Sequence, residues 1–131
     1  MWKKDFEVQN NIINKQHMKL FNIIDKIYDL YLTENLRDDI RNIIIELKDY
    51  TAYHFTTEET IYELNKLDYF EHKLEHNEFI KKIKSFEEKF IIENFNFRFI
   101  TEMNSYLLYW LSNHIYIEDK KMFNKINEKS K

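Results

Sequence analysis

The chain has 131 residues and a net charge of −3, and 44% of its residues are hydrophobic. This is the length of a single domain, assigned to residues 1–131, with enough apolar side chains for a buried core. The acidic balance argues against a nucleic-acid-binding surface. The absence of cysteine excludes disulfides and thiolate metal ligands and fits a reducing compartment.

The first residues, MWKKDFE, lack the apolar segment of a signal peptide, and no apolar run of about 18 residues could span a membrane. We therefore expect a cytoplasmic protein with no membrane span. The sequence also lacks glycine and proline. Turns must then be built from Asn, Asp, Thr and Ser, which favours a few long helices over a sheet with many tight turns.

The predicted elements begin with an arm, residues 1–12, whose Trp2, Phe6 and Val8 we expect to pack on the domain. Apolar residues in alternating steps of three and four then predict four amphipathic helices. After residue 120 we expect a short extra helical segment. The predicted helices lie within residues 13–31, 40–61, 69–90 and 100–117, and are joined at 33–35, 65–68 and 93–96.

Four helices with such short connections predict an all-α fold, an up-down-up-down antiparallel four-helix bundle with an N-terminal arm and a short C-terminal segment. The expected inward face of the second helix ends at Ile61. That of the fourth helix contains Trp110 and ends at Ile117.

All five histidines lie on these expected inward faces. A core histidine is usually a neutral side chain satisfied by one hydrogen bond, and the pair in HKLEH (72–76) is weak evidence for a metal on its own. In an antiparallel bundle, however, the starts of the first and third helices share an end with the finishes of the second and fourth. The histidines therefore converge at one end of the core, which favours a metal site. They are His17, His54, His72, His76 and His114.

Acidic side chains are expected beside these histidines. Glu58 follows His54 by four residues on the same face, and a buried carboxylate needs a cation or strong donors. Glu59 is interpreted as an exposed helix residue. Seven imidazole and carboxylate ligands are too many for one zinc and suit two six-coordinate ions, with iron the best match. No histidine has glutamate three residues before it, which disfavours the ferritin-like di-iron class.

The second acid can be read in two ways from the sequence. Ideal helix geometry favours Glu118, which follows His114 by four residues as Glu58 follows His54. Asp119 follows His114 by five residues, and it reaches the same face only if the last turn departs from a regular helix.

Four segments resemble the hemerythrin family, in particular the single-domain bacteriohemerythrins. They are QHMKLF (16–21), HFTTEE (54–59), HKLEHNEF (72–79) and WLSNHIYIED (110–119). The arm sequence WKKDFEV is also similar to the N-terminal arm of that family, so the resemblance covers nearly the whole chain. Asn14 is a departure, because the family usually has Asp at this position.

The resemblance implies a centre of two iron ions joined by an oxo or hydroxo bridge. Three histidines would hold one iron, two histidines the other, and two carboxylates would bridge them, with Asp119 favoured over Glu118. In that order, the implied ligands are His72, His76 and His114; His17 and His54; and Glu58 and Asp119.

By the same resemblance, the second iron has one open position at which O2 binds reversibly in an apolar pocket. For Trp110, ordinary core packing is the alternative to a place in the pocket wall. The implied pocket residues are Leu20, Phe55, Trp110, Leu111 and Ile115.

The first functional hypothesis is therefore an oxygen-binding protein, a carrier, store or sensor, and not an enzyme. We expect a monomer whose ligand is O2 and whose partner is an oxygen-consuming enzyme or a redox protein. The second hypothesis is a di-iron enzyme that acts on peroxide or nitric oxide, or that repairs iron centres. The third is an iron or zinc binding or storage module without gas chemistry.

Overall fold

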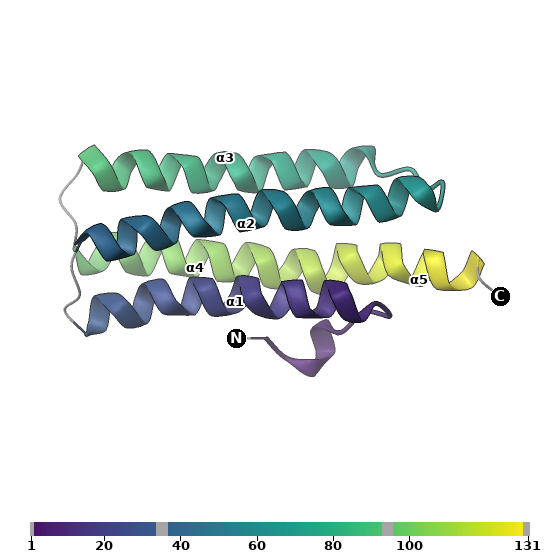
Figure 1. Ribbon diagram of the computed structural model, residues 1–131, viewed down its shortest axis with the longest axis horizontal. Coiled ribbons are helices and arrows are strands. Elements are labelled where there is room, and N and C mark those ends of the chain that lie inside the picture. The colour runs from purple at the N-terminus through teal and green to yellow at the C-terminus, as the bar shows by residue number, and fades with distance from the viewer. Residues whose placement is uncertain (1, 34–36, 93–95, 130–131) are drawn as a thin grey trace.

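The computed structural model describes residues 2–33, 37–92 and 96–129. Four long helices lie side by side, and consecutive helices run in opposite directions (Figure 1). The first helix packs against the second and the fourth, and the second packs against the third. The all-α antiparallel bundle is confirmed. Its helices are α1 (Asn11–Leu32), α2 (Arg37–Leu64), α3 (Phe70–Ile92) and α4 (Phe97–Asn113).

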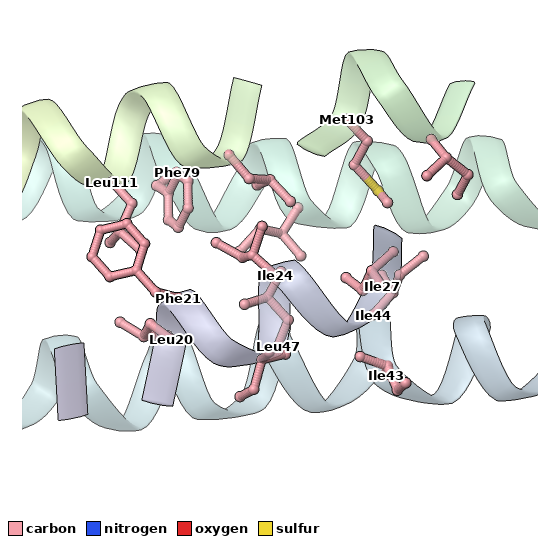
Figure 2. Close-up of a cluster of buried hydrophobic side chains, with 14 of the residues drawn as sticks. Leu20, Phe21, Ile24, Ile27, Ile43, Ile44, Leu47, Phe79, Met103 and Leu111 are labelled. Carbon is pink, nitrogen blue, oxygen red and sulfur yellow. The ribbon is translucent and has the colours of Figure 1, made fainter. Parts of the chain in front are cut away.

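The core follows the predicted apolar faces along most of the bundle. Figure 2 shows side chains from several helices meeting there, among them Ile24, Leu47 and Met103. Each of these three is at most 1% exposed. The inward face of α2 differs from the prediction at its C-terminal end, where Tyr62 is fully buried and Ile61 is only half-buried. Burial of this apolar surface is the main driving force for assembling the bundle.

The N-terminal arm packs on the bundle as expected. A short 3-10 turn, η1 (Lys4–Phe6), places the Phe6 ring on Phe21, with centroids 5.3 Å apart. Asn14 of α1 then fixes the arm, because its side chain accepts a hydrogen bond from Val8 N and donates one to Val8 O, both at 2.8 Å. An aspartate could accept but not donate here. Asn14, at the position where the family usually has Asp, therefore helps to attach the arm to α1.

The turns are built without glycine. Asn10 and Asn96 cap α1 and α4, since their side chains accept backbone hydrogen bonds from the first turns. Between α2 and α3, Lys66 has a φ of 57°, the left-handed conformation that glycine usually adopts at helix ends. The connections predicted at 33–35 and 93–96 lie between the helices, but residues 34, 35 and 93–95 are outside the described residues.

The fourth helix changes geometry where it reaches the last histidine. A π-helical turn, η2 (His114–Asp119), joins α4 to α5 (Lys120–Lys129), which is the predicted extra segment. Hydrogen bonds in a π-helix run from residue i to i+5, so the turn shifts the helical register. The prediction that Ile117 faces inward is wrong: it is 54% exposed, while Asp119 is fully buried. No helix in the described part of the chain is long and apolar enough to cross a membrane.

Candidate metal centre

All five histidines lie at one end of the bundle, as predicted. This is the end where α1 and α3 begin, α2 finishes and α4 passes into α5 (Figure 1). None of the five is more than 4% exposed, and Glu58 and Asp119 are fully buried among them. The seven residues expected as ligands are therefore brought together by α1, α2, α3 and η2.

These residues form two overlapping groups, within each of which one ligand atom per residue lies within 4.8 Å of the others. Glu58 and Asp119 belong to both groups, so they stand between the two. The five-ligand group comprises Glu58, His72, His76, His114 and Asp119, and the four-ligand group comprises His17, His54, Glu58 and Asp119.

In the five-ligand group, three imidazole rings point their Nε2 atoms toward one another. His114 Nε2 lies 3.0 Å from His76 Nε2 and 3.2 Å from His72 Nε2. Asp119 Oδ1 lies 2.9 Å from His72 Nε2 and 3.2 Å from His114 Nε2. The helix α3 and the turn η2 thus direct three ring nitrogens and a carboxylate oxygen at one small region.

In the four-ligand group, two imidazoles face the other sides of the same carboxylates. His17 Nε2 lies 3.3 Å from Glu58 Oε2 and 3.2 Å from Asp119 Oδ2. His54 Nε2 lies 3.4 Å from Glu58 Oε1. Each carboxylate therefore presents oxygens to histidines of both groups, which is the placement that a bridging ligand requires.

Several of these atoms are close together without being hydrogen-bonded. Glu58 Oε1 and Asp119 Oδ2 have no hydrogen-bond partner among the described residues, although imidazole nitrogens lie within 3.4 Å of each. Unpaired buried polar atoms are costly, and a cation at their common focus would satisfy them. Imidazole nitrogen with carboxylate oxygen is a donor set that suits iron. The residues present therefore fit a pair of iron ions.

The electrostatics of the cluster show how strongly its charges interact. Burial alone would lower the pKa of His17, but its contacts with Asp119 and Glu58 outweigh burial and raise the pKa to about 9. Burial likewise disfavours the charged form of His114, yet the neighbouring Asp119 carboxylate raises its pKa to about 10. For His54, burial prevails and the pKa is lowered.

The two carboxylates show the opposite effect. Burial and mutual repulsion would raise the pKa of Glu58, but His54 and His17 together hold it well below its usual value. Burial would also raise the pKa of Asp119, and His114 with its neighbours lowers it strongly. Both acids are therefore anionic at neutral pH and could hold a cation.

Outer hydrogen bonds orient two of the histidines. His54 Nδ1 lies 2.6 Å from Gln16 Oε1, and His76 Nδ1 lies 2.8 Å from Glu59 Oε2. Such partners fix the ring so that Nε2 faces the ligand cluster. The interpretation of Glu59 as an exposed residue is wrong, because its side chain is only 19% exposed. Its position five residues after His54 gave no helical reason to place it against His76 on another helix.

Two further polar residues beside the cluster were not predicted. Tyr62 is fully buried, and its hydroxyl lies 3.4 Å from His72 Nε2 and 3.5 Å from Asp119 Oδ1. Burial, together with the charges of Glu58 and Asp119, raises the pKa of Tyr62 well above its usual value, so the phenol keeps its proton. Glu75 lies 3.8 Å from His114 Nδ1, too far for a hydrogen bond.

The residues expected to form an apolar pocket lie in the main core or against it, and the Phe55 ring stacks on that of His76 with centroids 3.7 Å apart. Leu20, Phe55, Leu111 and Ile115 are at most 2% exposed and belong to the main core; Leu20 and Leu111 are labelled in Figure 2. Trp110 is half-buried, and its ring stacks on that of His114 with centroids 4.5 Å apart. Trp110 therefore contacts one of the candidate ligand residues directly.

The choice between Glu118 and Asp119 is explained by the π-helical turn. Because η2 is wound more widely than an α-helix, the residue five positions after His114 comes onto the same face. Asp119 accordingly lies 3.2 Å from His114 and points into the cluster. Glu118 is half-buried and lines a surface hollow together with Lys121.

Comparisons with known proteins agree with this geometry. The family model of the Hemerythrin HHE cation binding domain matches residues 9–126. The chain belongs to the hemerythrin family. It is 39% identical over 126 residues to a bacteriohemerythrin of Clostridium acetobutylicum, a match that covers 92% of this chain and 95% of that relative.

More distant relatives give the same family. A bacteriohemerythrin of Pseudomonas aeruginosa is 29% identical over 91% of this chain and 76% of the relative. A hemerythrin-like protein of Naegleria gruberi is 28% identical over 92% of this chain and 87% of the relative. Membership of the hemerythrin family and the buried histidine and carboxylate cluster together support a non-haem iron protein.

Proposed function

We propose that this hemerythrin-family chain holds two iron ions and binds O2 reversibly at one of them. The observation that carries the proposal is the division of seven buried ligand residues into a five-ligand and a four-ligand group that share two carboxylates. The five-ligand group would hold one iron with five protein residues. The four-ligand group would hold the other with one residue fewer, which would leave room for a small exogenous molecule.

When bound, the iron pair supplies the redox chemistry that reversible O2 binding needs, and the chain supplies the surroundings. Glu58 and Asp119 stand between the two groups and would bridge the irons, with an oxo or hydroxo group as the third bridge. Leu20, Phe55 and Leu111 are buried in the main core and would exclude water from the iron pair. Exclusion of water prevents side reactions at a reactive centre.

The position of the proton donors also favours binding over turnover. Tyr62, the buried phenol, contacts His72 of the five-ligand group and packs in a separate small cluster with Val8, Ile13, Met122 and Phe123. The apolar residues proposed for the pocket belong instead to the main core. A proton donor beside bound O2 would assist its reduction, so the packing of Tyr62 in a different apolar cluster from the pocket residues supports an oxygen-binding protein over an enzyme.

We further propose that the protein acts as a cytoplasmic monomer that carries, stores or senses O2. Its partner would be an oxygen-consuming enzyme or a redox protein.

The direct test is an optical oxygenation cycle. The iron-loaded protein is reduced without air, exposed to O2, and then degassed. We expect a visible absorption band that forms with O2 and disappears on degassing over repeated cycles. Irreversible oxidation in the first cycle would contradict reversible binding and favour an enzyme acting on peroxide or nitric oxide. A His54→Leu variant, which lacks a ligand of the four-ligand group, is the matched control and should show no reversible band.

Trp110 provides a second test of the pocket. Its half-buried ring covers His114, so Trp110→Ala should admit water to the cluster and speed autoxidation, with iron content unchanged. We expect a loss of about 2 kcal/mol in stability, because large-to-small changes of fully buried aromatic residues cost about 3–5 kcal/mol and Trp110 is only half-buried. Lower stability with an unchanged autoxidation rate would assign Trp110 to ordinary packing.

A further inference from the structure

The two ligand groups differ in the charge placed behind their histidines. In the five-ligand group, His76 Nδ1 donates to the Glu59 carboxylate at 2.8 Å, and the Glu75 carboxylate lies 3.8 Å from His114 Nδ1. In the four-ligand group, His54 Nδ1 faces the neutral amide oxygen of Gln16 at 2.6 Å. The Nδ1 atoms of His17 and His114, one in each group, have no hydrogen-bond partner within the described part of the chain.

The partners Gln16 and Glu59 are built features of the site and not mobile surface groups. Gln16 is 6% exposed, and it immediately precedes His17 in α1 while contacting His54 of α2. The Glu59 side chain is 19% exposed, and it immediately follows Glu58 in α2 while contacting His76 of α3. Each partner thus ties a histidine of one helix to a ligand-bearing turn of another.

The chemical consequence follows from the charge of each partner. An ionised carboxylate can only accept a hydrogen bond from Nδ1–H, and its negative charge makes the imidazole a stronger electron donor at Nε2. A neutral amide fixes the ring equally well but adds no charge. His76 of the five-ligand group is therefore a better donor to a highly charged ion than His54 of the four-ligand group.

We propose that Gln16 and Glu59 make the two metal positions electronically unequal, so that ferric iron is favoured in the five-ligand group and ferrous iron in the four-ligand group. The inference rests on the proposed iron pair and deepens it, because O2 binds to ferrous iron and the four-ligand group would leave room for it. Gln16 and Glu59 act here as positioning residues that also set the preferred oxidation state at each position.

The expected reduction of the oxidised centre proceeds in two one-electron steps. Dithionite supplies one electron to each ferric ion, which becomes ferrous while dithionite is oxidised. The first electron would reduce the iron held by the four-ligand group, at the higher potential, and the second would reduce the iron held by the five-ligand group, at the lower potential.

The test exchanges the side-chain charges at positions 16 and 59 by nearly isosteric substitutions. Glu59→Gln removes the charge behind His76 and should raise the lower potential. Gln16→Glu adds a charge behind His54 and should lower the higher potential. We expect each change to alter the ferric-to-ferrous ratio at its own position by about tenfold, or about 59 mV for a one-electron couple.

The measurement is an anaerobic potentiometric titration with dithionite, preceded by iron analysis of every variant. The matched control is Glu71→Gln, which removes an equal charge from an exposed position beside His72 in α3 and should leave both potentials in place. The inference is overturned if Glu59→Gln and Gln16→Glu move the potentials in the same direction. It is also overturned if they move the potentials by no more than the control does. Either result leaves the proposed iron pair unaffected. If the unaltered chain holds no iron, the proposed function fails and the inference with it.

Discussion

The two ends of the bundle use the same helices in different ways. Away from the histidines, α1, α2 and α4 are joined by Ile27, Ile40 and Ile100, which are all fully buried apolar residues. At the other end, the continuations of these helices and the start of α3 place five imidazoles and two carboxylates in the core (Figure 1). One end is stabilised by burial of apolar surface, and the other concentrates polar groups that burial alone would disfavour.

This difference shows what each end requires. Apolar packing is complete once the side chains interdigitate, and it needs nothing from outside the chain. The histidine end leaves carboxylate oxygens unpaired within the described residues and holds two acids in direct proximity to one another. We therefore expect the histidine end to depend on bound metal and the apolar end to be independent of it.

The largest effect is expected from removal of a bridging carboxylate. Asp119→Ala takes away an anionic ligand common to both groups, so iron content should fall well below that of the unaltered chain and the di-iron absorption should be lost. The matched control is Glu118→Ala, the neighbouring acid that lines the surface, which should keep both. The reverse result would show that the π-helical turn does not direct Asp119 into the iron site.

At the apolar end, a core substitution should affect stability without affecting metal. Leu47 is 1% exposed in the middle of α2, and Leu47→Ala should lower the free energy of unfolding by about 2–5 kcal/mol. Chemical denaturation and iron analysis are the measurements. Leu74→Ala, at a position 53% exposed, should change stability by no more than about 0.5 kcal/mol. Loss of iron in Leu47→Ala would show that the two ends are not independent.

The two ends should also differ in their response to pH. In iron-free protein, the pKa values of His17 and His114 are raised from 6.5 to about 9 and about 10. Their contribution to stability is then fully present below pH 6.5 and is lost as pH rises through about 9–10. The melting temperature of iron-free protein should therefore fall between pH 7 and pH 10.

Iron-loaded protein should not show this alkaline loss, because its imidazoles are already neutral ligands. It should instead release iron as pH falls below about 6.5, where protons compete for the ring nitrogens. Melting curves and iron content measured across the same pH series provide the test. Parallel pH profiles for the two forms would contradict the assignment of the histidines as ligands.

The smallest effect is expected at the turn between α2 and α3. Lys66 adopts a left-handed conformation at a φ of 57°, which costs a residue with a side chain roughly 1–2 kcal/mol and costs glycine little. Lys66→Gly should therefore raise stability by about 1 kcal/mol with iron content unchanged. Because this substitution also removes a positive charge, Lys73→Gln on the exposed face of α3 serves as the charge control. A loss of stability in Lys66→Gly would show that the turn is not strained.

Much of this architecture could be predicted from the spacing of apolar residues and histidines. The inward face of α1, and that of α2 as far as Glu58, follow from regular helical geometry. The meeting of the five histidines at one end follows from it too: His17, His54, His72, His76 and His114. Regular helical geometry could not predict that Ile117 faces outward and Asp119 inward, because the π-helical turn changes the register locally. Only the resemblance to hemerythrins pointed to Asp119.

The outer partners of the histidines were harder to predict for a different reason. Glu59 contacts His76 of α3, and Gln16 contacts His54 of α2. Such pairs depend on how neighbouring helices are rotated against one another, and the periodicity of a single helix does not contain that information. Tyr62 was missed because it lies next to Ile61, which the apolar pattern favoured equally well.

Metal analysis of the purified chain tests the central claim most directly. The iron, zinc and manganese contents are measured per chain after expression with iron supplied, alongside the Asp119→Ala variant. The two ligand groups predict about two iron ions per chain, because each group provides the donor set for one ion. A content of one ion per chain, or occupancy by zinc in place of iron, would contradict a di-iron centre.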